Sequence, residues 1–280
     1  MKSVGIIGSG RWGRNIARSF AKKRNVSRVV SSGNTDNLEK MKTIVPNIIV
    51  SSIDDLLEDE EIDSVVVAVP IENLSGVATK CLLKNKHVFL EKPAATSSDE
   101  IEKIEAVRGD RVCLVNYLYL VDPSYLSFKN AVQSVKIDEA VFVWRKWGSF
   151  NNDILLNLAS HELSMLVDTL EEVVIEGNES KLTDDSCIID FRTGPTRAII
   201  DIDRKSRTSH KSVMYKTSSG LFMWTPGFFA HADVEVISNE ADNLLDLQRD
   251  RFLSLVSQNQ SYTNLGLSKK ILELIEGIKQ

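Results

Sequence analysis

Three glycines near the N-terminus have the spacing of a dinucleotide-binding loop. Gly8, Gly10 and Gly13 fit the pattern Gly-x-Gly-x-x-Gly, between a β-branched run and a helical pattern. In such a loop the first glycine permits a tight turn, the second lets the backbone approach a pyrophosphate, and the third allows close packing of helix on strand. The helix N-terminus then faces the anion. We expect the loop to bind a dinucleotide through Gly8, Ser9, Gly10, Arg11, Trp12 and Gly13; the alternative is a glycine-rich turn without a ligand.

The segment after the second expected strand bears on the choice between NAD and NADP. About 20 residues after the glycines, an NAD-specific site usually has an acidic residue that holds the ribose 2′-hydroxyl. This chain instead reads Ser31-Ser32-Gly33-Asn34, and its first acid there is Asp36. Without a carboxylate a 2′-phosphate is not repelled, and Arg11 is a nearby cation for it. We therefore expect NADP(H) to be favoured over NAD(H), with Ser31, Ser32, Gly33 and Asn34 in the cofactor site.

The elements that position this loop alternate over the first 115 or so residues. Strands are expected at 4–7, 28–30, 48–50, 65–69, 87–90 and 112–115, and helices at 12–22, 52–57, 73–85 and 98–107. Strands that are apolar throughout are covered on both faces, as in a parallel sheet flanked by helices. The pattern predicts a Rossmann domain with a doubly wound parallel sheet over residues 1–119.

The remaining residues, 120–280, have a different pattern. Helices are expected at 123–134, 154–170, 241–258 and 267–278, and strands at 139–147, 173–176, 187–192, 196–203, 211–217 and 221–224. Turn signals at Gly194-Pro195 and Ser218-Ser219-Gly220 indicate hairpins. We expect an α+β domain with an open, largely antiparallel sheet that serves substrate binding and oligomerisation. Its C-terminal helices are candidates for packing back on the first domain.

Several motifs together resemble the Gfo/Idh/MocA family of oxidoreductases. After the glycine loop come Val67-Ala68-Val69-Pro70, Glu91-Lys92-Pro93, Asn116-Tyr117-Leu118-Tyr119 and Asn157-Leu158-Ala159-Ser160-His161, in the family's order. The resemblance spans essentially the whole chain, although the C-terminal domain is shorter than usual for the family. It implies a Rossmann domain followed by a domain with an open sheet, and NAD(P)-dependent chemistry on CH–OH groups where the two domains meet.

The resemblance also implies roles for individual residues. Lys92 would lie beside the nicotinamide and the reacting carbinol, Glu91 would position the cofactor side, and His161 would exchange a proton with the substrate hydroxyl. Val69, Pro70 and Asn116 complete the expected cofactor site. The position of Lys92 agrees independently, because open α/β sheets bind ligands at the carboxyl ends of their strands. An imidazole with an ordinary pKa of about 6.5 suits a general base at neutral pH.

Two positions depart from the family pattern. Many members have an Asp four residues before the histidine, where this chain has Asn157. Asn keeps a hydrogen-bonding group on the same helix face but carries no negative charge. We therefore expect His161 to be less readily protonated and Lys92 to carry more of the proton transfer. Leu74 stands where many members have a His, which affects the nicotinamide-side loop.

Aromatic and basic residues end the long strand before the His161 helix. Trp144, Arg145 and Trp147 can stack a sugar or nucleobase and hold a phosphate, and with Tyr117 and Tyr119 they are the candidate substrate residues. The competing interpretation is an aromatic pair on a sheet face with exposed cations.

Composition and charge exclude several classes of function. The formal net charge is -5 with both signs interspersed, whereas a nucleic-acid-binding protein has a basic face. The three cysteines lack the spacing of a zinc site or a disulfide framework. No apolar run resembles a signal peptide or a membrane span. We expect a cytoplasmic protein that binds no metal, nucleic acid or membrane. Because an open apolar sheet face rarely stays wet, we also expect a homodimer or homotetramer built through that sheet.

These observations predict an NADP(H)-dependent oxidoreductase that interconverts a secondary alcohol and a ketone on a sugar, cyclitol or sugar nucleotide. Two alternatives remain. One is an enzyme like the NAD-dependent glycoside hydrolases, which use the cofactor without net oxidation. The other is a non-catalytic dinucleotide-binding sensor or scaffold, which Asn157 makes more plausible.

Overall fold

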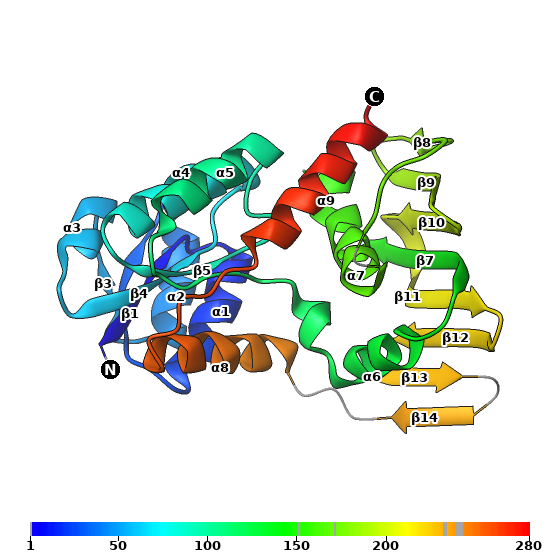
Figure 1. Cartoon of the computed structure of the whole chain (residues 1–280). Coiled ribbons are helices and arrows are strands. Elements are labelled where there is room, and N and C mark those ends of the chain that lie inside the picture. Colours follow the sequence, from blue (N-terminus) through cyan, green and yellow to red (C-terminus); the bar gives the residue numbers. More distant parts are fainter. Residues whose placement is uncertain (1, 151, 171, 232–233, 239–242) are drawn as a thin grey trace. The chain divides into compact units, whose positions relative to one another are not determined.

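The chain divides into two compact units. A computed structural model describes residues 2–150, 152–170, 172–231, 234–238 and 243–280. The first unit comprises Met1–Asn116 and Leu245–Lys269, and the second comprises Tyr117–Leu244 and Lys270–Gln280. A segment near the C-terminus therefore belongs to the unit that the N-terminus begins (Figure 1).

The first unit contains a six-stranded parallel sheet. Its strands are β1 (Ser3–Ile7), β2 (Val26–Val30), β3 (Ile49–Val50), β4 (Ile62–Val67), β5 (His87–Leu90) and β6 (Cys113–Val115), in the order β3-β2-β1-β4-β5-β6. Between them run α1 (Arg11–Ala21), α2 (Thr35–Ile44), α3 (Ile53–Glu58), α4 (Ile71–Leu83) and α5 (Ser98–Arg108). All neighbouring strands pair in parallel. The predicted Rossmann-type sheet is confirmed, and its order reverses between β1 and β4, the position where such sheets bind ligands.

An aromatic cluster joins the C-terminal segment to this unit. Phe252, in α8 (Leu244–Ser257), packs edge-on against Phe20 and Phe89 with ring centroids 6.0 and 5.6 Å away. Asp246 of the same helix forms ion pairs with Lys22 at 2.6 Å and Arg249 at 2.8 Å. The apolar core and this paired charge together fix α8 within the first unit.

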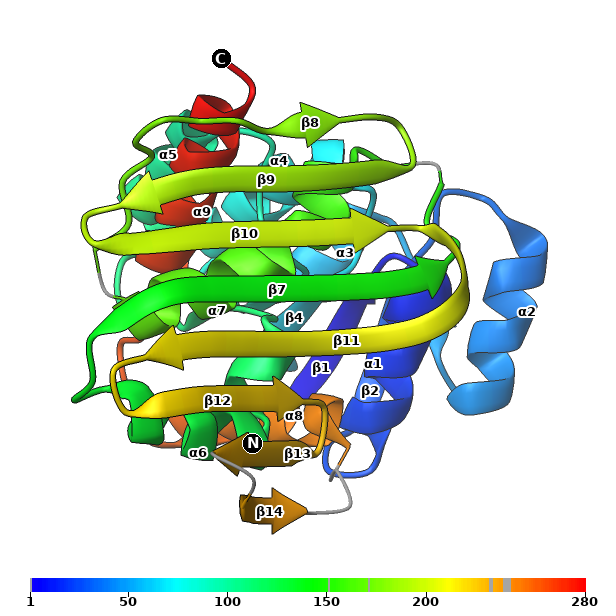
Figure 2. The ribbon, with the colours of Figure 1, turned by 90° about the vertical axis from the view of Figure 1, so that its right-hand side faces the viewer.

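The second unit contains an eight-stranded, mostly antiparallel open sheet. Its strands are β7 (Ile137–Trp147), β8 (Lys181–Leu182), β9 (Ser186–Thr193), β10 (Thr196–Asp203), β11 (Lys205–Thr217), β12 (Gly220–Thr225), β13 (Phe228–His231) and β14 (Val234–Ser238), in the order β14-β13-β12-β11-β7-β10-β9-β8. The sheet is mixed because β7 and β10 pair in parallel. Figure 2 shows this sheet face-on, with β8 at one edge and β14 at the other. The predicted α+β fold with an open sheet is confirmed.

Helices of the second unit precede and follow the long strand β7. They are the 3₁₀ turn η1 (Leu118–Val121), α6 (Pro123–Val132), the π-helical turn η2 (Leu155–Ala159), α7 (Ser160–Leu170) and α9 (Leu265–Ile278), which begins in the first unit. Asp122 caps α6, since its side chain accepts hydrogen bonds from the backbone N–H groups of Ser124 and Tyr125. Helices α6 and α7 lie behind the sheet in the view of Figure 2.

Several predicted elements are wrong or differ in extent. Residues 173–176 do not form a strand; Glu176 makes only an isolated bridge with Arg192. The sequence patterns also miss α2, in which only Met41 is buried. The Asn34 side chain caps this helix by accepting a hydrogen bond from the backbone N–H of Asn37. They miss β13 and β14 as well. The predicted helix 241–258 begins at Leu244, and its expected first residues lie outside the described part of the chain.

Candidate active site

The glycine loop has the geometry that its sequence predicts. Gly8 has a φ of 109°, and a Cβ there would lie 2.2 Å from the Ala68 carbonyl oxygen. A Cβ on Gly13 would lie 1.9 Å from the Gly8 carbonyl oxygen. A Cβ on Gly10, in contrast, would meet nothing within 4 Å. The fold itself therefore requires Gly8 and Gly13, whereas Gly10 borders open space in which a ligand could approach the backbone.

The N-terminus of α1 is suited to an anion. Gly10 is the N-cap and supplies no side-chain hydrogen bond, and the first turn contains no acidic residue. The first N–H groups of a helix carry partial positive charge and lack partners within the helix. Arg11 and Trp12 are both exposed at this turn. The residues present thus fit the pyrophosphate of a dinucleotide.

A hydrogen-bond network connects the glycine loop with the segment after β2. The hydroxyls of Ser9 and Ser31 are 2.7 Å apart. The Arg14 guanidinium donates to the carbonyl oxygen of Ser9 at 2.9 Å and to Asn37 Oδ1 at 2.5 Å. Asn37 in turn donates its backbone N–H to Asn34 Oδ1. The expected 2′-phosphate segment is therefore fixed against the loop, and Ser32 and Gly33 are exposed within it.

Polar groups also gather where β4, β5 and β6 end. Asn116 donates from Nδ2 to Glu91 Oε1 at 2.7 Å, and both residues are buried. Burial raises the pKa of Glu91 above its ordinary value. Asn116 Oδ1 is buried and has no hydrogen-bond partner among the described residues. Lys92 follows Glu91 and is half-buried, and Val69 and Pro70 lie at the end of β4. The parallel sheet thus brings these predicted cofactor residues to one edge.

His161 is the second residue of α7 and follows the π-helical turn. Such turns inside helices are rare and occur frequently at functional sites. Asn157 lies in that turn, and its backbone N–H donates to the Asp153 carbonyl at 2.9 Å. The His161 ring packs edge-on against Tyr119, with centroids 5.5 Å apart, and against Trp144, at 5.6 Å. The structure therefore brings together three of the residues predicted for catalysis and substrate binding.

A buried ion pair that sequence reasoning misses lies at these rings. Lys211 of β11 forms an ion pair with Glu162, the residue after His161. The side chains are 5% and 1% exposed. The ammonium lies 3.9 Å from the Trp144 ring centroid and 4.4 Å from that of Tyr119. Burial lowers the pKa of Lys211 and raises that of Glu162, while their attraction opposes both effects. The sequence does contain one signal for the burial of Lys211. Side chains alternate between the two faces of a strand, and Lys211 shares its face with Val213 and Tyr215, which are buried.

Two predicted substrate residues lie apart from this group. Arg145 pairs with Asp201, with Nη2 and Oδ2 2.5 Å apart. Because successive residues of a strand point to opposite faces, Arg145 faces away from the side on which Trp144 meets His161. Trp147 is 67% exposed and packs against Phe150 at 5.3 Å. Tyr117, in contrast, is fully buried at the start of the second unit.

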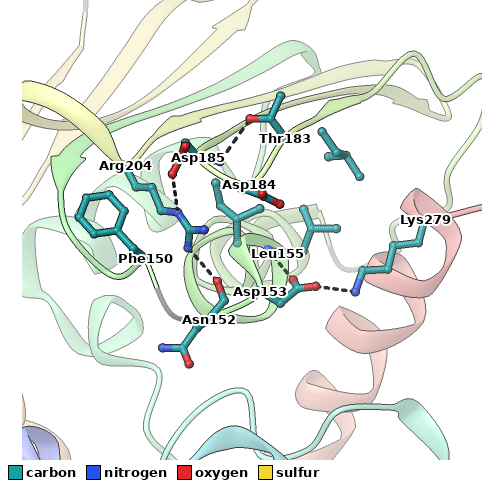
Figure 3. Close-up of a pocket in the computed structure, with 11 residues that line it drawn as sticks. Phe150, Asn152, Asp153, Leu155, Thr183, Asp184, Asp185, Arg204 and Lys279 are labelled. Atoms are coloured by element: carbon teal, nitrogen blue, oxygen red, sulfur yellow. Dashed lines mark hydrogen bonds and ion pairs between the residues drawn. The ribbon is translucent and has the colours of Figure 1, made fainter.

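A separate cavity of about 670 Å³ lies in the second unit (Figure 3). Two ion pairs join residues that line it: Lys279 with Asp153 at 2.8 Å, and Arg204 with Asp185 at 3.7 Å. The cavity is lined by Phe150, Asn152, Asp153, Ile154, Leu155, Leu182, Thr183, Asp184, Asp185, Arg204 and Lys279. None of these is a predicted site residue, and we assign the cavity no part in the chemistry.

The described residues also bear on membrane and metal binding. None of their helices has the length and apolarity that crossing a membrane requires. No group of three or more metal-ligating side chains among them is placed to hold a metal ion.

Comparisons with known proteins find a family match over the N-terminal region and partial similarity to curated relatives. Residues 2–117 match the model of the Gfo/Idh/MocA family, described as an oxidoreductase family with an NAD-binding Rossmann fold. Inositol 2-dehydrogenase 1 of Saccharopolyspora erythraea is 31% identical over 147 residues, which are 50% of this chain and 44% of that protein. An inositol 2-dehydrogenase of Rubrobacter xylanophilus is 26% identical over 138 residues, 44% of this chain and 40% of that protein. The chain thus matches less than half the length of these curated relatives.

Solved structures share the fold of both units. UDP-N-acetylglucosamine 3-dehydrogenase from Acidithiobacillus ferrooxidans has a TM-score of 0.87 at 16% identity, covering 99% of this chain and 96% of that chain. A 3-ketoreductase from Actinomadura kijaniata, solved in complex with TDP-benzene and NADP, has a TM-score of 0.86 at 15% identity, covering 100% and 97%. At these identities the likeness shows the fold alone.

Proposed function

We propose that the chain is an oxidoreductase of the Gfo/Idh/MocA family, whose model residues 2–117 match, and that it interconverts a secondary alcohol and a ketone on a sugar, cyclitol or sugar nucleotide. The observation that carries the proposal is the carboxyl edge of the parallel sheet. There the loop is open at Gly10, the α1 N-terminus has no side-chain cap, and Glu91, which pairs with Asn116, immediately precedes Lys92. The names of the similar proteins, dehydrogenases and a ketoreductase, agree with this reaction class.

The proposed mechanism divides hydride and proton between cofactor and protein. A dinucleotide held at Gly10 and the N-terminus of α1 would supply a nicotinamide able to accept a hydride from the carbinol carbon or to donate one to the ketone. The hydroxyl proton is exchanged by Lys92 of the first unit and His161 of the second, as general acid and base. Asn157 holds a hydrogen-bonding group one turn before His161 without adding charge, and Tyr119 and Trp144 offer aromatic surface to a sugar ring.

NADP(H) is the proposed cofactor because of the residues after β2. No carboxylate lies between Ser31 and Asn34, so a 2′-phosphate meets no repulsion there. Arg11 is exposed at the first turn of α1 and can pair with that phosphate. The network from Ser31 through Ser9 and Arg14 to Asn37 keeps the segment in place before the cofactor arrives.

A second candidate is a non-catalytic dinucleotide-binding sensor or scaffold. Asn157 favours it, because the position supplies no negative charge to the helix that carries His161. Such a protein binds NADPH but oxidises and reduces nothing.

The test is a turnover assay on cyclitols, free sugars and UDP- and TDP-linked sugars, in which the absorbance of NADPH is followed in both directions. We expect oxidation or reduction of at least one sugar-type substrate with cofactor turned over in equal amount. Substrate conversion without net change in NADPH supports glycoside hydrolase-like chemistry instead. Tight NADPH binding with no conversion of any compound supports the sensor, and binding of neither cofactor overturns the proposal.

We further propose roles for the two parts of the chain. Residues 1–119 serve the cofactor, and residues 120–280 serve the substrate and assembly into a homodimer or homotetramer through the open sheet. Ile188 and Leu221, on β9 and β12, are 43% and 50% exposed, which supports an apolar contact between subunits on this sheet.

We also propose a reducing, cytoplasmic location. It is supported by Cys81, Cys113 and Cys187, which are buried free thiols.

A further inference from the structure

Five side chains form one cluster where α7 meets the sheet of the second unit. The cluster consists of Lys211, Glu162, Tyr119, Trp144 and His161. They come from four elements far apart in the sequence: β11, α7, η1 and β7. The pairing of β7 with β11 places Lys211 directly opposite Trp144. The fold, and not sequence proximity, therefore assembles the cluster.

The ammonium of Lys211 is almost completely enclosed. It is compensated by the Glu162 carboxylate on one side and by the faces of two aromatic rings on others. Burying two charges carries a large desolvation penalty, which the attraction between them only partly offsets. Apolar residues of similar volume fill such positions with equal or greater stability in many proteins. Stability alone thus gives a weak reason for this pair.

The same two rings contact both the ammonium and His161. Trp144 lies 3.9 Å from the ammonium and 5.6 Å from the imidazole centroid. Tyr119 lies 4.4 Å from the ammonium and 5.5 Å from the imidazole centroid. A cation over a ring face resists rotation of that ring, because the attraction depends on the orientation of the ring. Holding both rings therefore limits the positions that the imidazole can take.

We infer that Glu162 and Lys211 are positioning residues for His161: the pair fixes the two rings around the imidazole and sets the electric field in which it gains or loses its proton. The inference rests on the proposed function only in treating His161 as an acid–base group. It accounts for a charged pair where the neighbouring Asn157 provides no carboxylate. The charges of Glu162 and Lys211 lie beside the two rings that contact His161.

Other groups lie near His161 on η1, β7 and the π-helical turn. Tyr119 stays protonated, because burial raises its pKa well above the ordinary value, with Glu162 and Asp122 adding to the shift. Lys146 of β7 lies 5.4 Å from the Trp144 ring centroid, on the strand that also carries that ring. Neither Tyr119 nor Asn157 brings a charge, so Glu162 and Lys211 are the buried charges of the cluster.

The test is proton NMR titration of the histidine rings in the full chain, without substrate. The chain has four histidines, and His161→Gln identifies the signal of His161. Removing a cation can only favour the imidazolium, and removing an anion can only disfavour it. The pKa of His161 is therefore expected to be higher in Lys211→Met than in Glu162→Gln, by about one unit for charges less than about 10 Å away. Lys216→Met, which removes an exposed lysine of the same strand, leaves the wild-type value.

Equal pKa values in the two variants, or the reverse order, overturn the inference. If a single variant fails to fold, Glu162→Gln/Lys211→Met buries no unpaired charge and is measured instead. The aromatic ring currents of Tyr119 and Trp144 act on the His161 protons, so displaced rings shift these signals. Unchanged His161 chemical shifts in the folded double variant also overturn the inference. Because no step requires turnover, a negative result here is distinguishable from the absence of any dehydrogenase activity.

Discussion

Lys92 is the residue on which the proposed chemistry depends most. It follows Glu91 at the carboxyl end of β5, where a parallel sheet binds its ligands. We predict that Lys92→Ala lowers turnover by at least ~10²-fold, as for loss of a positioned acid or base, with the NADPH dissociation constant within a few fold of wild type. Steady-state kinetics and a fluorescence titration measure the two quantities. Lys103→Ala, at an exposed lysine of α5, is the control, and near-normal turnover in Lys92→Ala contradicts the role.

Ser31 tests the cofactor preference at a single side chain. Its hydroxyl contacts Ser9, next to the open backbone of Gly10. Ser31→Asp places a carboxylate where a 2′-phosphate is expected, so NADPH should bind ~10-fold or more weakly while NADH binds at least as well. Ser31→Asn, of nearly the same size but neutral, controls for the loss of the hydroxyl. An unchanged ratio of NADPH to NADH affinity in the Asp variant places the 2′-position elsewhere.

Individual residues of the site differ in how far the sequence predicts them. The glycine loop and Lys92 can be predicted from the sequence, because each motif is contiguous and adjoins a strand. Lys211 and Glu162 cannot be predicted in this way, because their contact across 49 residues joins β11 to α7 through tertiary packing. Arg145 shows the opposite failure. It is adjacent to Trp144 in sequence, but strand alternation turns it to the other face of the sheet, where it pairs with Asp201.

At the scale of the element, the turn from β1 into α1 contains one glycine that packing requires and another that borders open space for a ligand. A Cβ at position 13 collides with the backbone of Gly8, whereas one at position 10 enters open space. Gly13→Ala is therefore predicted to destabilise the first unit by about 1–3 kcal/mol, as overpacking does. Gly10→Ala should leave stability within about 0.5 kcal/mol and weaken NADPH binding strongly. Urea unfolding and cofactor titration of the two variants give the comparison; full NADPH affinity in Gly10→Ala contradicts a pyrophosphate site at the loop.

The elements themselves follow from patterns of unequal strength. Runs such as 65–67 and 88–90 are apolar throughout and predict buried parallel strands, which the structure confirms. Helix α2 escapes prediction because only Met41 is buried within it, so it has no apolar stripe and relies on its Asn34 cap. Residues 173–176 look like a strand by composition, but only Glu176 finds a bridging partner. Short apolar runs therefore predict strands only where a neighbouring strand is available.

At the scale of the whole molecule, the open sheet makes assembly testable. We predict a dimer or tetramer in light scattering, and Leu221→Glu combined with Ile188→Glu should shift the mass to that of a monomer, because charge is costly in an apolar contact. Leu83→Glu, at a 61% exposed leucine of α4 in the first unit, is the matched control and keeps the wild-type mass. A wild-type chain that is monomeric at working concentrations contradicts the proposed assembly.

The most direct test of the central claim is calorimetric titration of NADPH and of NADH into the purified wild-type chain. An open glycine loop, an uncapped α1 and a carboxylate-free segment after β2 predict one dinucleotide bound per chain, with NADPH bound more tightly than NADH. Binding of neither cofactor would mean that the loop serves packing alone, and the proposed oxidoreductase activity would fall with it.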